Sequence, residues 1–472
     1  MAAQSHAIVG DGITALAFLE TCIGRGFRQV TVIGERASQL GRGVAYAKGE
    51  DGTPWRYAYL LNSPADDIDP AFAAWLEDNW DMVARTMAGR KPDWLSAAEP
   101  LVASGDLYGV NAPREFYGDY MEARADRVKD TLRAEGVDVQ IVDDQAVGIT
   151  LSGGDVILTT QSGQRVTVGS ADIAPGGPAT MRFNGDDGPF SAPSVFGNEH
   201  RISDHIVQGA EIFCIGGNAA MLDVLRLCQS QIAERDIKFA FCSPEGEIPP
   251  ALVPRLPRKL TRPTLTPGHG SAESFLGEIR REIDRAETEG DKRREIRAGF
   301  RAYFLETPLH RFVTDPTEAA KVSRVLRFWL RGGTRDTIFD MHRLVGSGNV
   351  RILKGRALSV ETHGISAVVH MIDENGAPCR EETGFVVNCA GAGPGSRYDA
   401  LTEDLLGKGL LEQVGGTGLA IGSGCQLGNA PLRYLSPAVT KIGEETAAMP
   451  LYDAHMLRTY VSRSGLSGGP SG

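Results

Sequence analysis

The sequence lacks the patterns that mark several classes of protein. Its seven cysteines form no C-x-x-C pair, which argues against thiol–disulfide catalysis and against a zinc site. Its nine histidines show no H-x-x-x-H or H-E-x-x-H spacing, and no Ser-His-Asp arrangement is visible. No run reaches the roughly 18 apolar residues that span a bilayer. We therefore expect no metal, no membrane anchor and a cytoplasmic location.

Basic residues are also in deficit. Lysine and arginine total 49 against 60 aspartates and glutamates, which gives a net charge of −11. Such a balance argues against nucleic acid or an anionic membrane as the main partner, and it favours a small-molecule substrate. At 472 residues, with 42% hydrophobic and 23% charged residues, the chain is typical of a globular protein of two to three domains. Cys214, Cys242 and Cys389 lie in apolar runs and are expected to be buried, inert thiols.

The most informative segment is "HAIVGDGITALAFLETC", at the N-terminus. Residues 7–9 are predicted to form a buried strand, Gly10-x-Gly12-x-x-Ala15 a turn, and residues 13–22 a helix. Gly10 permits the tight turn, Gly12 leaves room for a pyrophosphate, and Ala15 lets the helix pack closely. Free N–H groups at the start of the helix would bind that pyrophosphate.

A second strand, "QVTVIGE", ends at Glu35, which lies 20 residues after Ala15. A carboxylate at that distance meets the hydroxyl pair of a ribose in dinucleotide-binding folds. Strand, turn, helix, strand and acid together predict a dinucleotide site.

Three further segments carry a family resemblance: G-V-A-Y at 43–46, L-L-N-S-P-A at 60–65 and P-R-E-F-Y-G-D-Y at 113–120. With "ADIAPGG" (171–177), "VVNCAGAG" (386–393) and "YLSPAVTKIGEETAAMP" (434–450), they resemble a bacterial family of FAD/NAD(P)-binding flavoproteins. That family is distantly similar to the flavin-dependent N-hydroxylating monooxygenases of ornithine and lysine, and to two-dinucleotide folds of the thioredoxin-reductase type. The likeness covers most of the chain.

The resemblance implies an α/β fold with a Rossmann-like FAD-binding domain and an inserted, second Rossmann-like domain. It also implies FAD as cofactor. For Arg114, contact with a phosphate or the substrate and pairing with a nearby acid are equally good expectations. The residues expected to bind a cofactor are Gly10, Gly12, Ile13, Thr14, Ala15, Glu35, Arg36, Leu61, Asn62, Arg114, Gly443, Glu444 and Thr446 at FAD, with Gly216 and Asn218 at the second dinucleotide.

On this basis residues 1–178 and 380–472 form the FAD-binding domain and residues 205–379 the NAD(P)-binding-like domain. A helical insertion is expected over about 271–345, in which the charged stretch 278–296 is expected to be a solvated surface. Strands at 137–142, 146–150, 155–160 and 164–168 are predicted to form an antiparallel meander, and an Asn-Gly hairpin turn is predicted at 375–376.

The stretch "CIGGNAAMLD" (214–223) stands where a second dinucleotide turn is expected, but Asn218 replaces a glycine. Asparagine tolerates positive φ, so the turn is expected to survive with a narrower groove. Glu245 and Glu247, after the next strand, would repel the 2′-phosphate of NADP and favour NADH over NADPH. Three alternatives stand: a working nicotinamide site, a degenerate site, or a site rebuilt for another ligand. Arg255, Arg258, Lys259 and Arg262 form a basic loop that would hold a phosphate, an acidic substrate or only solvent.

No catalytic residue is identified, because the chemistry is expected to be the flavin's. The leading hypothesis is an FAD-dependent monooxygenase that oxygenates, by N-hydroxylation, a small polar amine or amino-acid-like metabolite. The alternatives are an FAD-linked oxidase or dehydrogenase with a degenerate nicotinamide site, and a non-enzymatic flavin- or nucleotide-binding module. A homodimer is the base-rate expectation.

Overall fold

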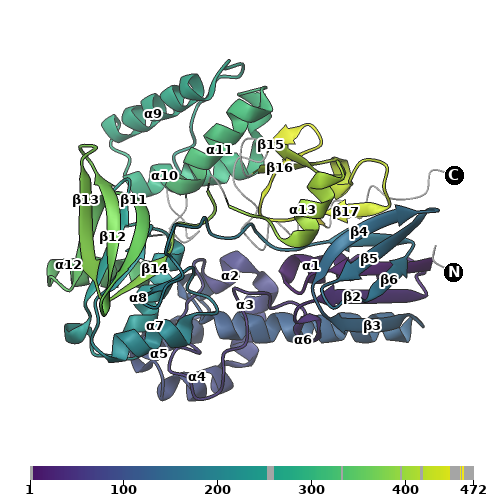
Figure 1. Cartoon of the computed structure of the whole chain (residues 1–472), viewed down its shortest axis with the longest axis horizontal. Helices are drawn as coiled ribbons and strands as arrows, with labels where there is room; N and C mark the ends of the chain where they lie inside the picture. The colour runs from purple at the N-terminus through teal and green to yellow at the C-terminus, as the bar shows by residue number, and fades with distance from the viewer. Residues whose placement is uncertain are drawn as a thin grey trace.

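The computed structural model describes residues 4–251, 260–330, 333–393, 396–414, 418–446, 458 and 460–461. One parallel and one mixed sheet, each with helices around it, lie on opposite sides of the molecule, and a helical segment lies above them in Figure 1. Within those ranges no helix is both long and apolar enough to cross a membrane.

The first sheet is parallel throughout and has the order β17-β7-β1-β2-β3. Its central strand β1 is buried along its whole length, as expected of a parallel sheet covered on both faces. The strands are β1 (Ser5–Val9), β2 (Gln29–Gly34), β3 (Asp138–Asp143), β7 (Ser170–Ile173) and β17 (Leu432–Tyr434). Because β17 joins β7, the C-terminal part of the chain returns to the first domain.

Six helices surround this domain or extend from it. The longest, α6, contacts both α1 and β3. The six are α1 (Ile13–Glu20), α2 (Ala65–Ile68), α3 (Pro70–Asp78), α4 (Trp80–Ala88), α5 (Pro92–Ala103) and α6 (Arg114–Ala134). Together with the first sheet they form one large apolar core.

The predicted meander is only partly present. β4 (Ala146–Ser152), β5 (Asp155–Thr160) and β6 (Arg165–Val168) form an antiparallel sheet of three strands. The predicted strand at 137–142 is wrong as part of it, because the corresponding β3 pairs in parallel with β2 in the first sheet. Side chains alternate with a period of two in either kind of pairing, so the sequence pattern did not separate them.

The second sheet has the order β13-β12-β11-β10-β9-β14-β8. Its parallel part contains β9 (Ile212–Ile215), β10 (Phe239–Ser243), the start of β11 (Val350–His363), β14 (Phe385–Asn388) and β8 (Ser191–Ala192). β11, β12 (Ser366–Asp373) and β13 (Pro378–Thr383) form an antiparallel extension, with the predicted Asn-Gly turn between the last two. Since β14 belongs to this sheet, the chain leaves the second domain after Asn388 rather than near residue 380.

Helices α7 (Glu199–Val207), α8 (Ala219–Gln229) and α12 (Arg335–Gly346) pack together beside the second sheet. The helices α9 (Ala272–Thr288), α10 (Arg293–Glu306) and α11 (Pro316–Leu330) have a separate apolar core that includes Phe275, Ile279 and Phe300. The charged stretch 278–296 therefore has one buried apolar stripe beneath its exposed charges.

A small C-terminal sheet completes the fold. It consists of β15 (Glu412–Val414), β16 (Gly418–Ile421), β18 (Val439–Ile442) and β19 (Glu445–Thr446), with α13 (Ala400–Gly407) preceding it. Helix α11 packs against β15, β18 and β19, so the helical segment also touches the C-terminal part of the chain.

Candidate functional site

The first glycine turn has the geometry that the sequence predicts. Gly10 has φ of +117°, and its N–H donates to the carbonyl of Ile33 over 2.7 Å. A Cβ at this position would lie only 2.2 Å from the carbonyl oxygen of Ala174, so only glycine fits. Ala15 is fully buried between helix and strand.

The N-terminus of α1 is open. Gly12 is the N-cap residue, no side chain caps the helix, and a Cβ there would meet nothing nearer than Gly43 Cα at 3.7 Å. Ile13 and Thr14 form the first turn with no acidic residue. Backbone N–H groups without a capping side chain bind anions such as a pyrophosphate.

Asp11, which the sequence argument did not single out, organises the rim of this turn. Its carboxylate accepts a hydrogen bond from the N–H of Arg36 over 2.9 Å, and its carbonyl accepts one from Gly41 over 2.8 Å. Glu35 follows β2 directly and is exposed beside this rim. The predicted acid is therefore placed at the carboxyl end of the second strand.

Arg42 holds the G-V-A-Y loop in place. Its guanidinium, on a side chain only 2% exposed, pairs with Asp119 and donates to Glu122 over 2.7 Å and to the carbonyl of Tyr46 over 3.2 Å. A Cβ on Gly118 would collide with this guanidinium. The P-R-E-F-Y-G-D-Y motif on α6 thus fixes the loop that lies over Gly12.

Glu115, in the same motif, fixes the following segment. Its carboxylate accepts from Arg56 over 3.0 Å and from the N–H of Gly49 over 3.1 Å. Burial raises the pKa of Glu115, although both donors oppose this. The motif therefore acts mainly by docking loops around the first turn.

The second turn repeats the first in its backbone. Gly216 has φ of +112°, its N–H donates to Cys242 over 2.8 Å, and a Cβ would lie 2.5 Å from the carbonyl oxygen of Cys389. Asn218 takes the place of Gly12 as the N-cap of α8. Its φ is −119°, so the expectation that asparagine is tolerated here through positive φ is wrong.

The second turn is capped where the first is open. The side chain of Asn218 accepts a hydrogen bond from the N–H of Ala220 over 3.0 Å and donates one to the carbonyl of Cys389 over 2.6 Å. Glu245 and Glu247 are exposed beyond β10. Of the predicted basic loop, Arg255, Arg258 and Lys259 lie outside the described residues, whereas Arg262 is exposed.

A family model described as FAD-NAD(P)-binding matches residues 7–178. Residues 7–178 are an FAD-NAD(P)-binding domain. This match confirms the prediction of an FAD-type dinucleotide cofactor, and the choice between NADH and NADPH stays a prediction. No curated protein matches the chain in sequence.

Solved structures of two monooxygenases and a hydroxylase share the fold over almost the whole chain. The FAD-bound cadaverine monooxygenase of the desferrioxamine pathway from Erwinia amylovora has a TM-score of 0.56 at 10% identity, over 98% of this chain and 94% of that one. The L-lysine 6-monooxygenase from Pseudomonas syringae has a TM-score of 0.53 at 13% identity, over 98% of both chains. The reduced ornithine hydroxylase from Pseudomonas aeruginosa has a TM-score of 0.50 at 14% identity, over 98% and 97%. At these identities the likeness establishes the two-dinucleotide flavoprotein fold and confirms the predicted fold class.

In the FAD-NAD(P)-binding domain, the Leu61–Asn62 segment is held through its backbone. Leu61 donates its N–H to Ala112 over 2.8 Å, and its carbonyl accepts from the side chains of Asn111 and Thr334, each over 3.0 Å. Thr334 is the N-cap of α12, so the second half of the chain also touches this segment. Asn62 is half-buried beside it.

Arg114 forms the ion pair that was one of its two expected roles, and the acid belongs to the other domain. Its guanidinium meets both carboxylate oxygens of Asp223 on α8 at 2.9 Å and donates to the carbonyl of Leu60 over 3.1 Å. Both side chains are buried. This pair joins the FAD-NAD(P)-binding domain to the helix of the second turn.

Gly443 and Glu444 form the turn between β18 and β19, and Thr446 lies in β19. Gly443 has φ of +59° and donates its N–H to Ile421 over 2.8 Å, Glu444 is exposed and Thr446 is buried. They belong to the C-terminal sheet rather than to the sheet of the first turn. Their proximity to the flavin stays a prediction.

The structure brings together a serine, a histidine and an aspartate that the sequence did not. His6 Nδ1 lies 2.7 Å from Ser170 Oγ, and His6 Nε2 lies 3.0 Å from Asp172 Oδ2. His6 is buried against Phe27, and Asp172 is bound by Arg433 from β17. This network joins β1, β7 and β17 within the first sheet.

The structure confirms the burial that the sequence predicts for three of the cysteines. Cys214, Cys242 and Cys389 are buried, and burial raises the pKa of Cys242 to about 12. Among the described residues no group of three or more histidine, cysteine or acidic side chains could hold a metal ion.

Proposed function

We propose that this chain is an FAD-dependent monooxygenase that N-hydroxylates a small polar amine or an amino-acid-like metabolite. The observation that carries the proposal is the uncapped N-terminus of α1 behind Gly10 and Gly12. It is supported by a fold shared, over almost the whole chain, with enzymes described as a cadaverine monooxygenase, an L-lysine 6-monooxygenase and an ornithine hydroxylase. The proposal includes a cytoplasmic location.

The residues of the first turn fit FAD. The N–H groups of Ile13 and Thr14 would bind the pyrophosphate, because Gly12 places no side chain over them. Glu35 would accept hydrogen bonds from the adenosine ribose. When bound and reduced, FAD supplies the oxygen-activating chemistry that no side chain can supply.

The protein's own part is to bind, to orient and to exclude water. Arg42 keeps the G-V-A-Y loop packed on Gly12, and Asn111 and Thr334 fix the carbonyl of Leu61. A cofactor site with rigid walls holds reacting atoms in place and limits unproductive reaction with water. We assign no catalytic acid or base to this chain.

A second candidate function is an FAD-linked oxidase or dehydrogenase that takes electrons directly from its organic substrate. The observation that favours it is the capped second turn, in which Asn218 occupies the position of an open glycine. Such an enzyme would need no nicotinamide.

The test is made on the purified, FAD-loaded chain. Flavin absorbance is followed without oxygen after mixing with NADH, with NADPH, or with a panel of diamines and basic amino acids alone. In air, the same mixtures are analysed by mass spectrometry for addition of one oxygen atom to the amine.

Oxygen-dependent formation of a hydroxylamine, with the flavin reduced by a nicotinamide, is the expected result. Bleaching by an amine alone, without oxygen insertion, would replace the proposal with the second candidate. Gly12→Asn serves as the control, because its side chain would cover the pyrophosphate position and should remove FAD.

A further inference from the structure

Asn218 bridges the two walls of the second dinucleotide turn. One wall is the start of α8, whose Ala220 N–H donates to Asn218 Oδ1 over 3.0 Å. The other is the segment after β14, whose Cys389 carbonyl accepts from Asn218 Nδ2 over 2.6 Å. A Cβ on Gly391 would lie 3.4 Å from the same Nδ2 atom. The amide therefore links the start of α8 to the segment after β14.

The first turn has the same backbone framework but a glycine, Gly12, at the position of Asn218. Ala174, after β7, corresponds to Cys389, after β14. In each turn the first glycine packs against the carbonyl oxygen of this residue, at a distance that leaves no room for a Cβ. Gly12 has no side chain to reach across. A second difference lies beneath the helix, where buried Met221 stands in the position of Ala15.

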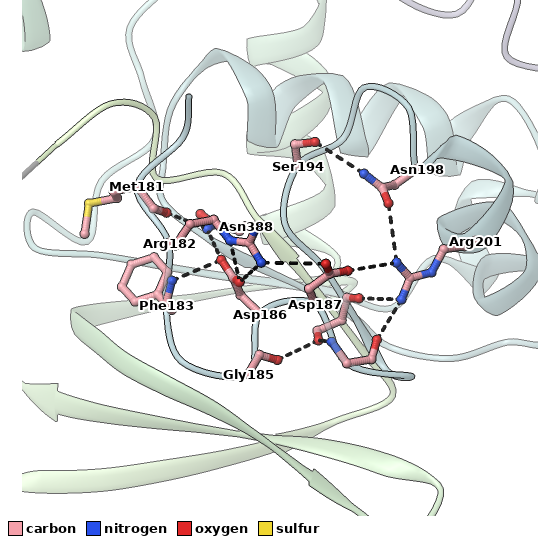
Figure 2. A network of polar contacts seen from close by, with 12 residues as sticks. Met181, Arg182, Phe183, Gly185, Asp186, Asp187, Ser194, Asn198, Arg201 and Asn388 are labelled. Atoms are coloured by element: carbon pink, nitrogen blue, oxygen red, sulfur yellow. Dashed lines mark hydrogen bonds and ion pairs between the residues drawn. The ribbon is translucent and has the colours of Figure 1, made fainter. Parts of the chain in front are cut away.

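Asn388, the residue before Cys389, is anchored by the polar network that Figure 2 shows. Asn388 donates to Met181 O over 2.8 Å and to the carboxylate of Asp186 over 2.7 Å. The N–H of Met181 in turn donates to Gly391 O over 2.9 Å. Asn388 and Asp186 are each only 1% exposed, so this wall is fixed and Asn218 keeps its acceptor.

A dinucleotide at this turn needs the helix N-terminus and the space in front of it. We infer that Asn218 is a specificity-determining residue that occupies the pyrophosphate position of the second turn and weakens the binding of nicotinamide dinucleotides there. The inference rests on the proposed function, since it concerns the reductant of the same flavin.

The test is isothermal titration of the FAD-loaded full chain with NAD⁺ and with NADP⁺. Displacing Asn218 breaks two hydrogen bonds, so Asn218→Gly is expected to bind at least one of the two about tenfold tighter than the natural chain. Glycine is nearly as good an N-cap residue as asparagine, so α8 should persist. Asn218→Ser keeps a cap but cannot span to Cys389. Its affinity for the dinucleotide should fall between those of the natural chain and of Asn218→Gly.

Ser271→Gly is the matched control. It removes the side-chain cap of α9, where Ser271 accepts from the N–H of Ser274 over 3.2 Å, and should leave both affinities unchanged. Affinities of Asn218→Gly and Asn218→Ser no tighter than that of the natural chain, with unchanged thermal unfolding, would overturn the inference. These affinities are measured without any substrate, so failure to form a hydroxylamine would leave this result intact.

Discussion

The ion pair between Arg114 and Asp223 is the sharpest test of how the two domains are joined. Arg114 begins α6 beside the Leu60 carbonyl, and Asp223 lies on α8, five residues after Asn218. Their side chains are only 10% and 8% exposed. Any change to one partner therefore leaves the other charged and buried between the domains.

We expect Arg114→Met to lower the free energy of unfolding by about 3–5 kcal/mol, because Asp223 would lose its counter-ion away from water. The double variant Arg114→Met/Asp223→Leu should regain most of that loss, since an apolar pair of similar volume avoids the cost of burying charge. The coupling energy from the double-mutant cycle should reach at least about 2 kcal/mol. Equilibrium unfolding in urea, followed by tryptophan fluorescence, measures all of these differences.

The control lies on the same helix. Arg133 pairs with Asp130 at 3.0 Å, but the two side chains are 52% and 74% exposed. Arg133→Met should therefore cost less than about 1 kcal/mol. The reasoning would be refuted if Arg114→Met cost no more than this control, or if the double variant were less stable than either single one.

Three further outcomes follow from buried groups. Burial lowers the pKa of Lys91 to about 7. Between that pH and about pH 10 the unfolded chain binds one proton more than the folded chain, so the free energy of unfolding should rise with pH, by at most about 1.4 kcal/mol per unit. Urea midpoints of Lys91→Met should lack that rise, and an identical rise would contradict us. Although burial opposes it, His6 and Arg433 together hold the pKa of Asp172 below its ordinary value. Its stabilisation is thus present above about pH 3.9 and lost as pH falls through the folded pKa, and Asp172→Asn should cost about 3–5 kcal/mol at neutral pH and weaken that acid dependence in urea titrations. Gly10→Ala would place a Cβ 2.2 Å from the Ala174 carbonyl, so the purified variant should carry little FAD by absorbance, and full flavin occupancy would count against the first turn as its site.

The first turn was predictable because its geometry is local. Gly10, Gly12 and Ala15 satisfy steric demands that arise within one strand, one turn and one helix. The helical insertion expected over about 271–345 was predictable for the same reason, since helices follow from spacing along the chain, and α9 to α12 lie in or close to this range.

Long-range partners were not predictable. The strand at 138–143 was misassigned because its alternation does not reveal that β2 is its neighbour. His6 and Asp172 are 166 residues apart in sequence. Arg42 likewise pairs with acids on α6 that are distant in sequence. Each such contact depends on which strands and helices pack together, which no local pattern encodes.

The sequence by itself determined that the chain contains a dinucleotide turn, and that the second turn departs from it at Asn218. Only the tertiary structure decided what that departure does. A side-chain amide bridges a turn only if an acceptor stands opposite, and the Cys389 carbonyl lies just after β14, 171 residues further along the chain. Backbone turns are fixed by neighbours in sequence, whereas the walls of a site are fixed by neighbours in space.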